Sequence, residues 1–248
     1  MSGKARTQWE RQAGYLMRKV DAAIADHQMI RDGDRVLVGF SGGKDSYALL
    51  RLLIHRRSSC KERYAVVAAH IVGDARGASI GLPEIIRDEL VSSGIGYHIR
   101  ELPVETDEPL PMDCDRCSRY RRKALFHLAN ELGCNCLALG HNLEDFAHTA
   151  LMNLFTHGRL ETMSYAADYF DAAIRLVRPL AYVTEHEIRR FGRASGYVPP
   201  SSECPLADTS RRQSARDTMR LASKEFRFAA QNIVKAARPL NQADDHSP

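Results

Sequence analysis

Hydrophobic and polar positions follow two different periods along the chain, and the two periods alternate. Short apolar runs predict buried strands at residues 35–40, 65–72, 97–101, 136–139 and 173–177. Apolar positions three and four residues apart predict helices at residues 15–24, 47–54, 83–92, 119–132, 146–155 and 184–195. Strands separated by helices of this length favour parallel pairing, because a parallel connection needs a crossover. We therefore expect an α/β fold with a doubly wound parallel sheet, covered on both faces.

Changes in these patterns divide the chain into three parts. Residues 1–30 are predicted to be an N-terminal helical segment, and residues 31–197 to be an α/β domain that carries a C-x-x-C motif. The run V-P-P-S-S from Val198 onward is typical of a hinge. Residues 198–248 then form a C-terminal segment, within which residues 209–238 are predicted to be a basic helical arm.

Composition excludes some classes of protein. Of the 248 residues 44% are hydrophobic, so the chain can bury a core and is not a disordered chain. The 35 Lys and Arg residues exceed the 31 Asp and Glu residues, and the net charge of +4 permits a nucleic-acid partner without requiring one. Neither a secretory h-region nor an apolar run of about twenty residues is seen, so we expect a cytoplasmic protein with no membrane partner.

A glycine turn lies between the first predicted strand and the following helix. Its six residues are Ser41, Gly42, Gly43, Lys44, Asp45 and Ser46. Backbone N–H groups and the positive end of the helix dipole can bind an anion in this context. Glycine suits it because a side chain would block phosphate oxygens and disfavour a positive φ. The turn is not a Walker A loop, which has four residues between its glycines and a Ser or Thr after the Lys.

These residues resemble the SGGxDS loop of the PP-loop ATP pyrophosphatases. The resemblance implies ATP binding and cleavage between the α and β phosphates, which gives an adenylated substrate and pyrophosphate. A second segment, G-H-N-L-E-D from Gly140 to Asp145, follows a predicted buried strand, where doubly wound sheets place their ligands. Taken alone, His141 could equally be a capping or core histidine. Beside the first turn it matches the nucleotide segment of the family.

The cysteines allow several interpretations. Cys114 and Cys117 form the C-x-x-C motif, and Cys204 lies far downstream, after the predicted hinge. Zinc would need a fourth ligand, an iron–sulfur cluster could use three thiolates, and a redox pair would need only the first two. Cys134 and Cys136 flank a predicted buried strand, where we expect them to pack in the core. Six cysteines in a chain of this kind do not indicate a disulfide framework.

The sequence from about residue 20 to residue 212 resembles that of the tRNA 2-thiocytidine synthetases, and it is less similar to the tRNA 2-thiouridine enzymes. The matching segments include S-G-G-K-D-S, C-D-R-C-S-R-Y-R-R, L-A-L-G-H-N-L-E-D and R-P-L-A-Y. The resemblance implies a 4Fe-4S cluster on Cys114, Cys117 and Cys204, ATP with Mg²⁺ at the glycine turn, and a tRNA substrate. The family usually has a second C-x-x-C near the third ligand. In this sequence Ser201 occupies the position of the first cysteine of that second motif. This removes any role for that cysteine in relaying sulfur but leaves the three cluster ligands.

We therefore expect adenylation of a pyrimidine 2-carbonyl, in an anticodon-loop cytidine, and replacement of its oxygen by sulfur. Lys44 would neutralise phosphate charge, Asp45 and Asp145 would hold Mg²⁺ or orient the base, and Ser41 and Ser46 would bind phosphate. Arg121, four residues after Cys117, would stabilise charge near the cluster. A cysteine desulfurase or another source of sulfide is the expected partner, and homodimerisation is an open alternative.

Basic residues offer a surface for RNA. Arg116, Arg119, Arg121, Arg122 and Lys123 follow the first cysteine. In the predicted arm, Arg212, Arg216 and Arg220 are spaced four residues apart, so on a helix they share one face. Such a stripe is more often a solvated face. Next to a nucleotide turn and a cysteine site, it also suits phosphate contacts to a folded RNA.

Two rival functions remain open from the sequence. The first is another ATP-activated tRNA modification, either 2-thiouridine synthesis or lysidine ligation. Lysidine ligation shares the glycine turn but has no use for three clustered cysteines. The second is a nucleotide-binding module that regulates a partner without turnover. Pyrophosphate release that depends on tRNA would exclude the second rival.

Overall fold

The central sheet of the computed structural model, which describes residues 7–76, 83–105, 107–200 and 211–239, has six strands in the order β3-β2-β1-β4-β7-β6. Their bounds are β1 Arg35–Gly39, β2 Ala65–Val72, β3 Gly96–Glu101, β4 Cys136–Ala138, β6 Ala166–Tyr169 and β7 Ile174–Val177. Strands β1, β2, β3, β4 and β7 are parallel, as predicted, whereas β6 is antiparallel to β7. The predicted α/β fold class is confirmed, with one added antiparallel edge strand.

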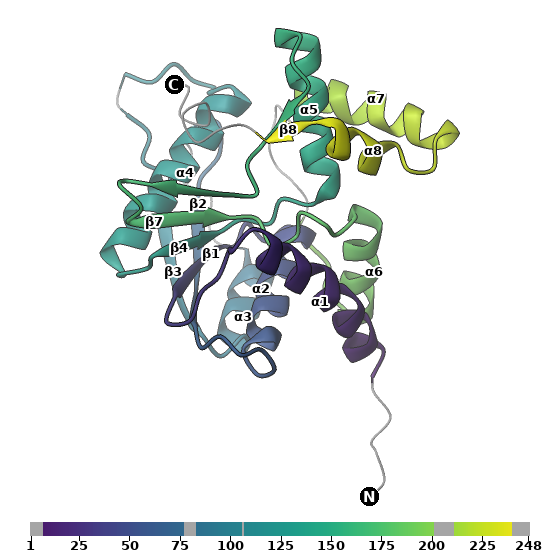
Figure 1. The fold of residues 1–248 in the computed structure, drawn as a ribbon. Helices are drawn as coiled ribbons and strands as arrows, with labels where there is room; N and C mark the ends of the chain where they lie inside the picture. The colour runs from purple at the N-terminus through teal and green to yellow at the C-terminus, as the bar shows by residue number, and fades with distance from the viewer. Residues whose placement is uncertain (1–6, 77–82, 106, 201–210, 240–248) are drawn as a thin grey trace, which may run out of the picture.

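Helices cover the two faces of this sheet unequally (Figure 1). Below the sheet in that view lie α1 Gln8–Asp26, α2 Lys44–Arg56, α3 Glu84–Ser92 and α6 Glu185–Ser195. The opposite face carries α4 Cys114–Glu131. Side chains on β1 alternate between the two cores: Val36 and Val38 pack with α1, α2, α3 and α6, whereas Leu37 packs with α4. This period-two burial explains why the strands appear as continuous apolar runs.

The order of strands creates a switch point between β1 and β4. From β1 the chain winds outward to β2 and β3, and it then returns to place β4 on the other side of β1. Val36 pairs with Cys136 and Val38 with Ala138, so the two strands end at the same edge of the sheet. The turns that follow lead to α2 and α5 (Leu143–His157), at the position where sheets of this kind have their ligand-binding crevice.

The C-terminal part of the chain returns to α5. Helices α7 Arg211–Glu225 and α8 Ala229–Ala236 pack on α5 through a cluster that includes Phe146, Ala215, Met219 and Val234. The basic arm predicted over residues 209–238 is therefore two helices rather than one. Strand β8 Arg238–Pro239 then pairs in parallel with β5 Glu161–Thr162, just after α5.

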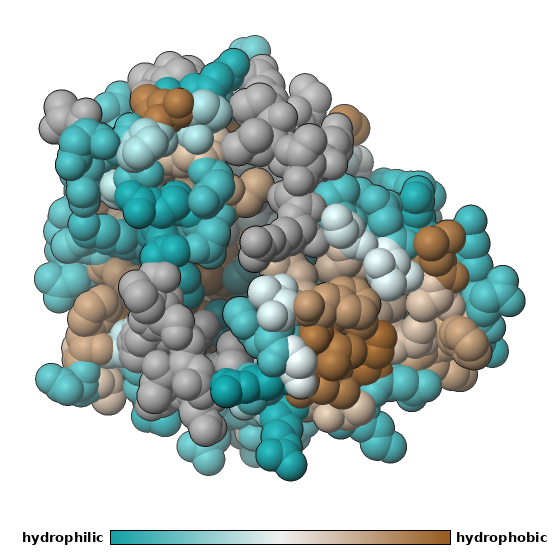
Figure 2. Space-filling model, turned by 90° about the horizontal axis from the view of Figure 1, so that it is seen from above, coloured by the Kyte–Doolittle hydropathy of each residue, from teal (hydrophilic) through white to brown (hydrophobic). Residues whose placement is uncertain are grey.

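Seen from above, hydrophobic surface gathers on the right, the side on which α5, α7 and α8 lie (Figures 1 and 2). The large exposed apolar side chains of these helices are Leu154, Phe155, Leu221 and, in the α7–α8 connection, Phe226 and Phe228. Within the described residues, no helix combines the length and the apolar character needed to cross a bilayer.

Several elements differ from the sequence prediction in their bounds, and three short strands were not predicted. Helix α4 begins at Cys114 rather than at residue 119, because Asp113 caps it by accepting a hydrogen bond from the Arg116 N–H. Strand β6, at residues 166–169, was missed because four residues are too few to show a period. The three-part division of the chain stays a prediction. Helix α1 shares a core cluster with β1 and α2, and α7 and α8 share one with α5.

Candidate functional site

The turn between β1 and α2 has a backbone conformation at Gly42 that favours glycine. Gly42 has φ +83°, and a Cβ at this position would meet the Ile86 side chain at 2.4 Å. Gly43 caps α2, and a Cβ there would contact only Ser41 Oγ, at 3.4 Å. The turn therefore leaves uncovered backbone in front of a helix N-terminus, where an anion can approach closely.

The two serines of the turn define its shape. Ser46 Oγ accepts a hydrogen bond from the Ser41 N–H at 3.1 Å and donates to the Gly43 carbonyl at 2.9 Å. Ser41 Oγ lies 3.1 Å from Ser46 Oγ and accepts a hydrogen bond from the Gly43 N–H at 3.3 Å. The predicted phosphate-binding serines thus also hold the backbone amides of the turn in place.

Tyr197, which follows α6, fixes the direction of one peptide in this turn. Its hydroxyl donates to the Gly42 carbonyl at 2.7 Å, and its ring stacks on Tyr47 with the centroids 3.9 Å apart. In a trans peptide the carbonyl and the next N–H point in opposite directions. Because Tyr197 holds the Gly42 carbonyl, the Gly43 N–H faces away from Tyr197, toward the Ser41 hydroxyl. Tyr197 therefore orients an amide that an anion would use.

Lys44 lies between two carboxylates. Its Nζ is 2.9 Å from Asp45 Oδ2 and 3.0 Å from Glu185 Oε1, at the first residue of α6. Burial opposes the charge of Lys44, but the two carboxylates outweigh it and raise the pKa of Lys44. The two ion pairs thus fix the charged Lys44 side chain beside the glycine turn.

The turn between β4 and α5 is hydrogen-bonded to the first turn. Asn142 caps α5 by accepting from the Asp145 N–H at 3.2 Å, and Asp145 Oδ2 accepts from the Asn142 N–H at 3.0 Å. Asn142 Nδ2 also donates to Asp45 Oδ1 at 2.9 Å. Burial, with the nearby charge of Asp45, raises the pKa of Asp145. The two predicted magnesium-binding carboxylates therefore lie on either side of Asn142.

Gly140 allows the two turns to approach. A Cβ at this position would lie 3.1 Å from the Asp45 carbonyl carbon and 3.1 Å from the Ser46 nitrogen. Both are backbone atoms, so no side chain could rotate to make room. Gly140 is needed for a close approach between two backbones rather than for an unusual φ.

His141 lies against buried Arg178. The Arg178 Nε donates to His141 Nδ1 at 3.3 Å, so the neutral ring carries its proton on Nε2. Burial lowers the pKa of His141 well below its usual value, and the charges of Arg178, Arg212 and Arg122 lower it further. His141 is therefore neutral at pH 7 and offers an N–H donor rather than a charge.

Arginines of α7 lie near the same turn. Helix α7 packs on α5 through Ala215 and Met219, and Arg212 and Arg216 flank this contact. Burial, then the charge of Arg216, lowers the pKa of His148 on α5 to about 4, and Arg212 adds to the effect. Arg220 instead pairs with Asp217 at 3.1 Å. The predicted basic stripe thus has two members beside the nucleotide turn and one farther away.

The C-x-x-C motif lies in the first turn of α4. Cys114 is exposed and Cys117 is half-buried, and their spacing puts both on one face of the helix. Arg121 lies on that face and donates to the carbonyls of Ile71, at 2.8 Å, and Gly73, at the carboxyl end of β2. The cysteine face of α4 is therefore turned toward the edge of the sheet that holds both turns.

The other cysteines divide as follows. Cys134 and Cys136 are 3% and 0% exposed, and burial raises the pKa of both thiols, so the prediction that they pack in the core is confirmed. Cys204, the predicted third ligand, lies outside the described residues, as does Ser201. Within the described ranges, no three His, Cys, Asp or Glu side chains are grouped so that they could hold a metal ion.

Comparison with known proteins agrees with this geometry. A family model for the PP-loop domain matches residues 13–198. A tRNA-cytidine(32) 2-sulfurtransferase of Pelobacter propionicus is 36% identical over 228 residues, which cover 89% of this chain and 84% of the relative. The chain therefore belongs to the tRNA-cytidine(32) 2-sulfurtransferase family. Another tRNA-cytidine(32) 2-sulfurtransferase, from Cellvibrio japonicus, is 32% identical over 242 residues, 95% of this chain and 79% of the relative. The family resemblance inferred from the sequence is confirmed.

A solved structure supports the fold assignment. The U34-tRNA thiolase NcsA from Methanococcus maripaludis, solved with its 4Fe-4S cluster, aligns with a TM-score of 0.75 at 22% identity. The alignment covers 97% of this chain and 81% of that chain. At this identity the likeness shows that this member of the tRNA-cytidine(32) 2-sulfurtransferase family shares the fold of that thiolase.

The structure brings most of the predicted nucleotide-site residues together. Residues 41–46, Gly140, His141 and Asp145 meet at the β1–β4 crevice. Sequence reasoning missed Asn142, Arg178, Glu185 and Tyr197. Two of these had a signal, because Asn142 lies in the G-H-N segment and Arg178 in the R-P-L segment. Glu185 and Tyr197 had none, because their contacts come from α6, more than a hundred residues after the glycine turn.

Proposed function

We propose that this protein is an ATP-dependent tRNA sulfurtransferase that replaces the 2-carbonyl oxygen of an anticodon-loop cytidine with sulfur. The observation that carries the proposal is the meeting of two helix-capping turns at one crevice, with Lys44, Asp45 and Asp145 beside it and the Cys114–Cys117 pair facing the same edge. The names of the relatives supply the reaction class and the base. The geometry supplies the parts that such a reaction needs.

The ATP step would use the first turn. A carbonyl oxygen is a poor leaving group, so it must first be converted to a better one. The 2-carbonyl oxygen attacks the α phosphorus, the bond to the bridging oxygen breaks, and pyrophosphate leaves with its electron pair. Lys44 and the Gly43 amide would stabilise the charge that grows on the departing phosphates, and Ser41 and Ser46 would hold them.

Asp45 and Asp145 fit a magnesium ion. Both carboxylates are joined through Asn142, and oxygen ligands of this kind suit Mg²⁺. When bound, the ion neutralises phosphate charge. Burial raises the pKa of Asp145, and an adjacent cation would favour its ionised form instead. Neutral His141 would donate a hydrogen bond from its Nε2–H group to the nucleotide.

Cys114 and Cys117 fit two of the three ligands proposed for a 4Fe-4S cluster. Both lie at a helix N-terminus, which favours thiolates, and neither is buried. Cys204 is the proposed third ligand. When bound, such a cluster supplies the sulfide that replaces the adenylated oxygen, with AMP as the leaving group. Arg121 shares the cysteine face, and we propose that it stabilises charge there.

The substrate and partners complete the proposal. A tRNA would contact Arg212 and Arg216, whose charges already reach the second turn. A cysteine desulfurase or another sulfide source would renew the sulfur, and homodimerisation stays an open alternative. We also propose that the protein acts in the cytoplasm.

The direct test is tRNA-dependent pyrophosphate release followed by mass spectrometry of the tRNA nucleosides. We expect pyrophosphate only when tRNA is present, and 2-thiocytidine in the product when sulfide is supplied. Release without tRNA, or lysidine in the product, would overturn the proposal.

The cysteines are tested separately. Protein purified without oxygen should be brown, and Cys114→Ala, Cys117→Ala or Cys204→Ala should each remove the colour. Cys60→Ala is the matched control, because Cys60 is half-buried in the loop before β2, where it contacts the Glu62 carbonyl. A colourless protein with one tightly bound zinc ion would exclude the cluster.

A further inference from the structure

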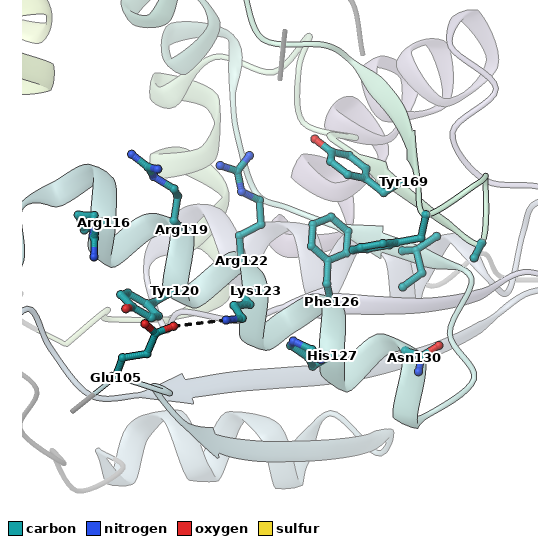
Figure 3. Close-up of a pocket in the computed structure, with 13 residues that line it drawn as sticks. Glu105, Arg116, Arg119, Tyr120, Arg122, Lys123, Phe126, His127, Asn130 and Tyr169 are labelled. Carbon is teal, nitrogen blue, oxygen red and sulfur yellow. Dashed lines mark ion pairs between the residues drawn. The ribbon is translucent and has the colours of Figure 1, made fainter. Parts of the chain in front are cut away.

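A large cavity lies on the face of the sheet that α4 covers, away from the nucleotide site. Its volume is about 940 Å³, which is in the range of small-molecule and nucleotide sites. It lies between the outer side of α4 and the β6–β7 hairpin (Figure 3). In the described residues α4 is the helix that packs on this face, and beyond it the cavity is lined by Tyr169 and Ile174, which are buried, and by the exposed Phe170.

One wall of the cavity is aromatic. The Phe126 ring centroid lies 4.8 Å from that of Tyr169 and 5.2 Å from that of Phe170, which meets it edge to face. Tyr169 and Phe126 are buried below the surface, whereas Phe170 is 63% exposed. A ring this exposed at the mouth of a cavity gains little from folding and is available to a planar ligand.

The backbone at Phe170 is unusual. Phe170, Asp171 and Ala172 have φ values of +55°, +53° and +65°, and none of them is glycine. Such conformations cost roughly 1–3 kcal/mol each and cluster at ligand-binding sites. A strained turn therefore presents the Phe170 ring to solvent, where it is not needed for the core.

The other wall of the cavity is cationic. Arg119 and Arg122 extend from α4 to the same side, and Phe126 and Tyr169 lie beyond them (Figure 3). Arg119 pairs with Asp115, and Lys123 lies 3.6 Å from Glu105. Such exposed pairs contribute about 0–1 kcal/mol and can exchange for a phosphate.

Arg122 differs from its neighbours. In the part of the chain that the structure describes, it forms neither a hydrogen bond nor an ion pair, although Glu105 is the carboxylate that lines the cavity with it. Its charge also contributes to the lowered pKa of His141. Arg122 therefore lies between the cavity and the nucleotide turn.

The cavity and the cysteines occupy opposite sides of the same helix. Arg116, Tyr120, Lys123 and His127 recur every three or four residues along the cavity side. Cys114, Cys117 and Arg121 share the other side. A helix with its side chains is about 10–12 Å across, and the nine residues from Cys117 to Phe126 add about 14 Å along the axis, so several nucleotides of single-stranded RNA would join the two places.

We propose that this cavity binds an unpaired base of the RNA substrate, in the same loop as the base that is modified. The base stacks on the exposed Phe170 ring, and its phosphate contacts Arg122. This assignment rests on the proposed function, because it takes RNA as the ligand. Aromatic stacking combined with a cationic wall is the usual chemistry of single-strand recognition. The helix α4 then lies between two nucleotides of one loop.

The first test measures binding of an anticodon stem-loop by fluorescence anisotropy. Phe170→Ala should weaken binding about tenfold, because stacking on an aromatic side chain contributes about that much per base. Phe170→Trp should retain the affinity. Alanine keeps the same backbone strain as phenylalanine, so the turn is not relieved. The matched control is Phe155→Ala on α5, since Phe155 is 65% exposed and does not line the cavity.

A thermodynamic cycle separates stacking from a structural effect. Each loop nucleotide in turn is made abasic, and binding is measured with the wild type and with Phe170→Ala. At one position the abasic site should lower the affinity of the wild type about tenfold and should not lower the affinity of Phe170→Ala any further. If every abasic position costs both proteins equally, or if Phe155→Ala is as weak as Phe170→Ala, the proposal is wrong.

The phosphate contact is tested by salt dependence. Arg122→Gln should reduce the slope of log K against log salt by about 0.7, the value for one single-strand phosphate. Arg63→Gln is the control, because Arg63 is exposed and precedes β2, which β1 and β4 separate from β7 and the cavity. An unchanged slope for Arg122→Gln would remove this contact from the proposal.

Turnover distinguishes failure of this inference from failure of the function. At saturating tRNA, Phe170→Ala should thiolate at a rate within twofold of the wild type, with KM raised about tenfold. If the wild type thiolates tRNA but no base couples to Phe170, the cavity assignment fails and the function stands. If the wild type binds the stem-loop with this coupling but modifies no tRNA, the reaction class fails and the cavity assignment stands.

Discussion

The turns after β1 and β4 end at the same crevice, yet they are built from different groups. The first turn offers backbone amides and serine hydroxyls, and its glycines keep it uncovered. The second turn offers ionisable side chains, His141 and Asp145, held in partly buried positions. Backbone amides and serine hydroxyls keep their hydrogen-bonding character over the working range of pH, whereas the ionisation of His141 and Asp145 depends on burial and on neighbouring charge. The two turns thus combine fixed dipoles with ionisable groups, as the proposed nucleotide site requires.

The largest effect is expected where the two turns touch. Gly140→Ala would place a Cβ 3.1 Å from two backbone atoms of Asp45 and Ser46, so the turns must move apart. Overpacking of this kind costs about 1–3 kcal/mol, and we expect that loss in unfolding free energy together with a loss of ATP affinity of tens of fold. Urea unfolding and calorimetry measure the two losses.

Gly192→Ala is the matched control for Gly140→Ala. Gly192 is buried in α6, but nothing lies within 4 Å of where its Cβ would stand. We expect no loss of stability, because alanine is favoured over glycine in a helix. Equal behaviour of the two variants would show that the close approach at Gly140 is not required.

A change in the first turn alone should separate binding from stability. Gly43→Val adds a branched side chain where phosphate oxygens would approach, while a Cβ at Gly43 meets only Ser41 Oγ, at 3.4 Å. ATP affinity should fall at least tenfold, about 1.4 kcal/mol, and the unfolding midpoint should stay close to that of the wild type. Unchanged affinity in calorimetry would mean that phosphate does not bind at this turn.

Removing one hydroxyl should have a smaller effect on the same turn. Tyr197→Phe loses the hydrogen bond to the Gly42 carbonyl but keeps the ring that stacks on Tyr47. We expect ATP binding to weaken about fivefold, or about 1 kcal/mol, because the Gly43 amide loses its fixed direction. In Tyr64→Phe a buried hydroxyl loses a similar bond, to the Leu53 carbonyl, far from the turn. ATP affinity should fall in the first variant alone.

The smallest effect concerns pH and α5. The pKa of His148 is lowered to about 4 in the folded protein, below its usual 6.5, by burial and then by Arg216. The unfolded chain therefore binds more protons between these values, and stability is full above pH 6.5 and falls as the pH drops toward 4. His148→Gln should flatten this dependence by less than about 1.4 kcal/mol per pH unit.

Urea unfolding at pH 7.5, 6.5, 5.5 and 4.5 measures this difference. His186→Gln, an exposed position on α6, is the control and should leave the dependence as it is. If His148→Gln also leaves it unchanged, the loss of stability in acid comes from other groups.

Sequence periodicity predicted the parts of the fold in which local pattern and burial agree. Strand β1 and helix α2 follow from an apolar run, a glycine turn and helical spacing, and they meet the expected bounds closely. Strand β6 could not be found in this way, because its pairing with β7 is decided by the hairpin turn at residues 170–173. The start of α4 was placed too late, because its first two turns are charged and only the Asp113 cap marks them.

The candidate site was predictable to the extent that its residues are adjacent in sequence. The turns at residues 41–46 and 140–145 each carry their own signal. Contacts between distant segments had none: Glu185 reaches Lys44 from α6, and Tyr197 reaches Gly42 from the end of the same helix. The cavity at Phe170 also depends on tertiary structure, because it lies between α4 and the β6–β7 hairpin. The function class was predictable because the motifs are specific to a family, and the family is confirmed.

The pairing of β8 with β5 joins the end of the C-terminal arm to the segment that follows α5. The Arg238 N–H donates to the Leu160 carbonyl at 3.0 Å, so the chain that leaves α5 returns to its end after α8. The entropic cost of closing a loop grows only slowly with its length, so the short β5–β8 pairing can close the long loop that lies between these two strands. A movement of α7 is transmitted to α5, because α7 and α8 both pack on α5 and β8 pairs with β5. We therefore expect the backbone amides of α7, α8 and the Asp145 turn to exchange their hydrogens at similar rates, because these segments open together as one cooperative unit.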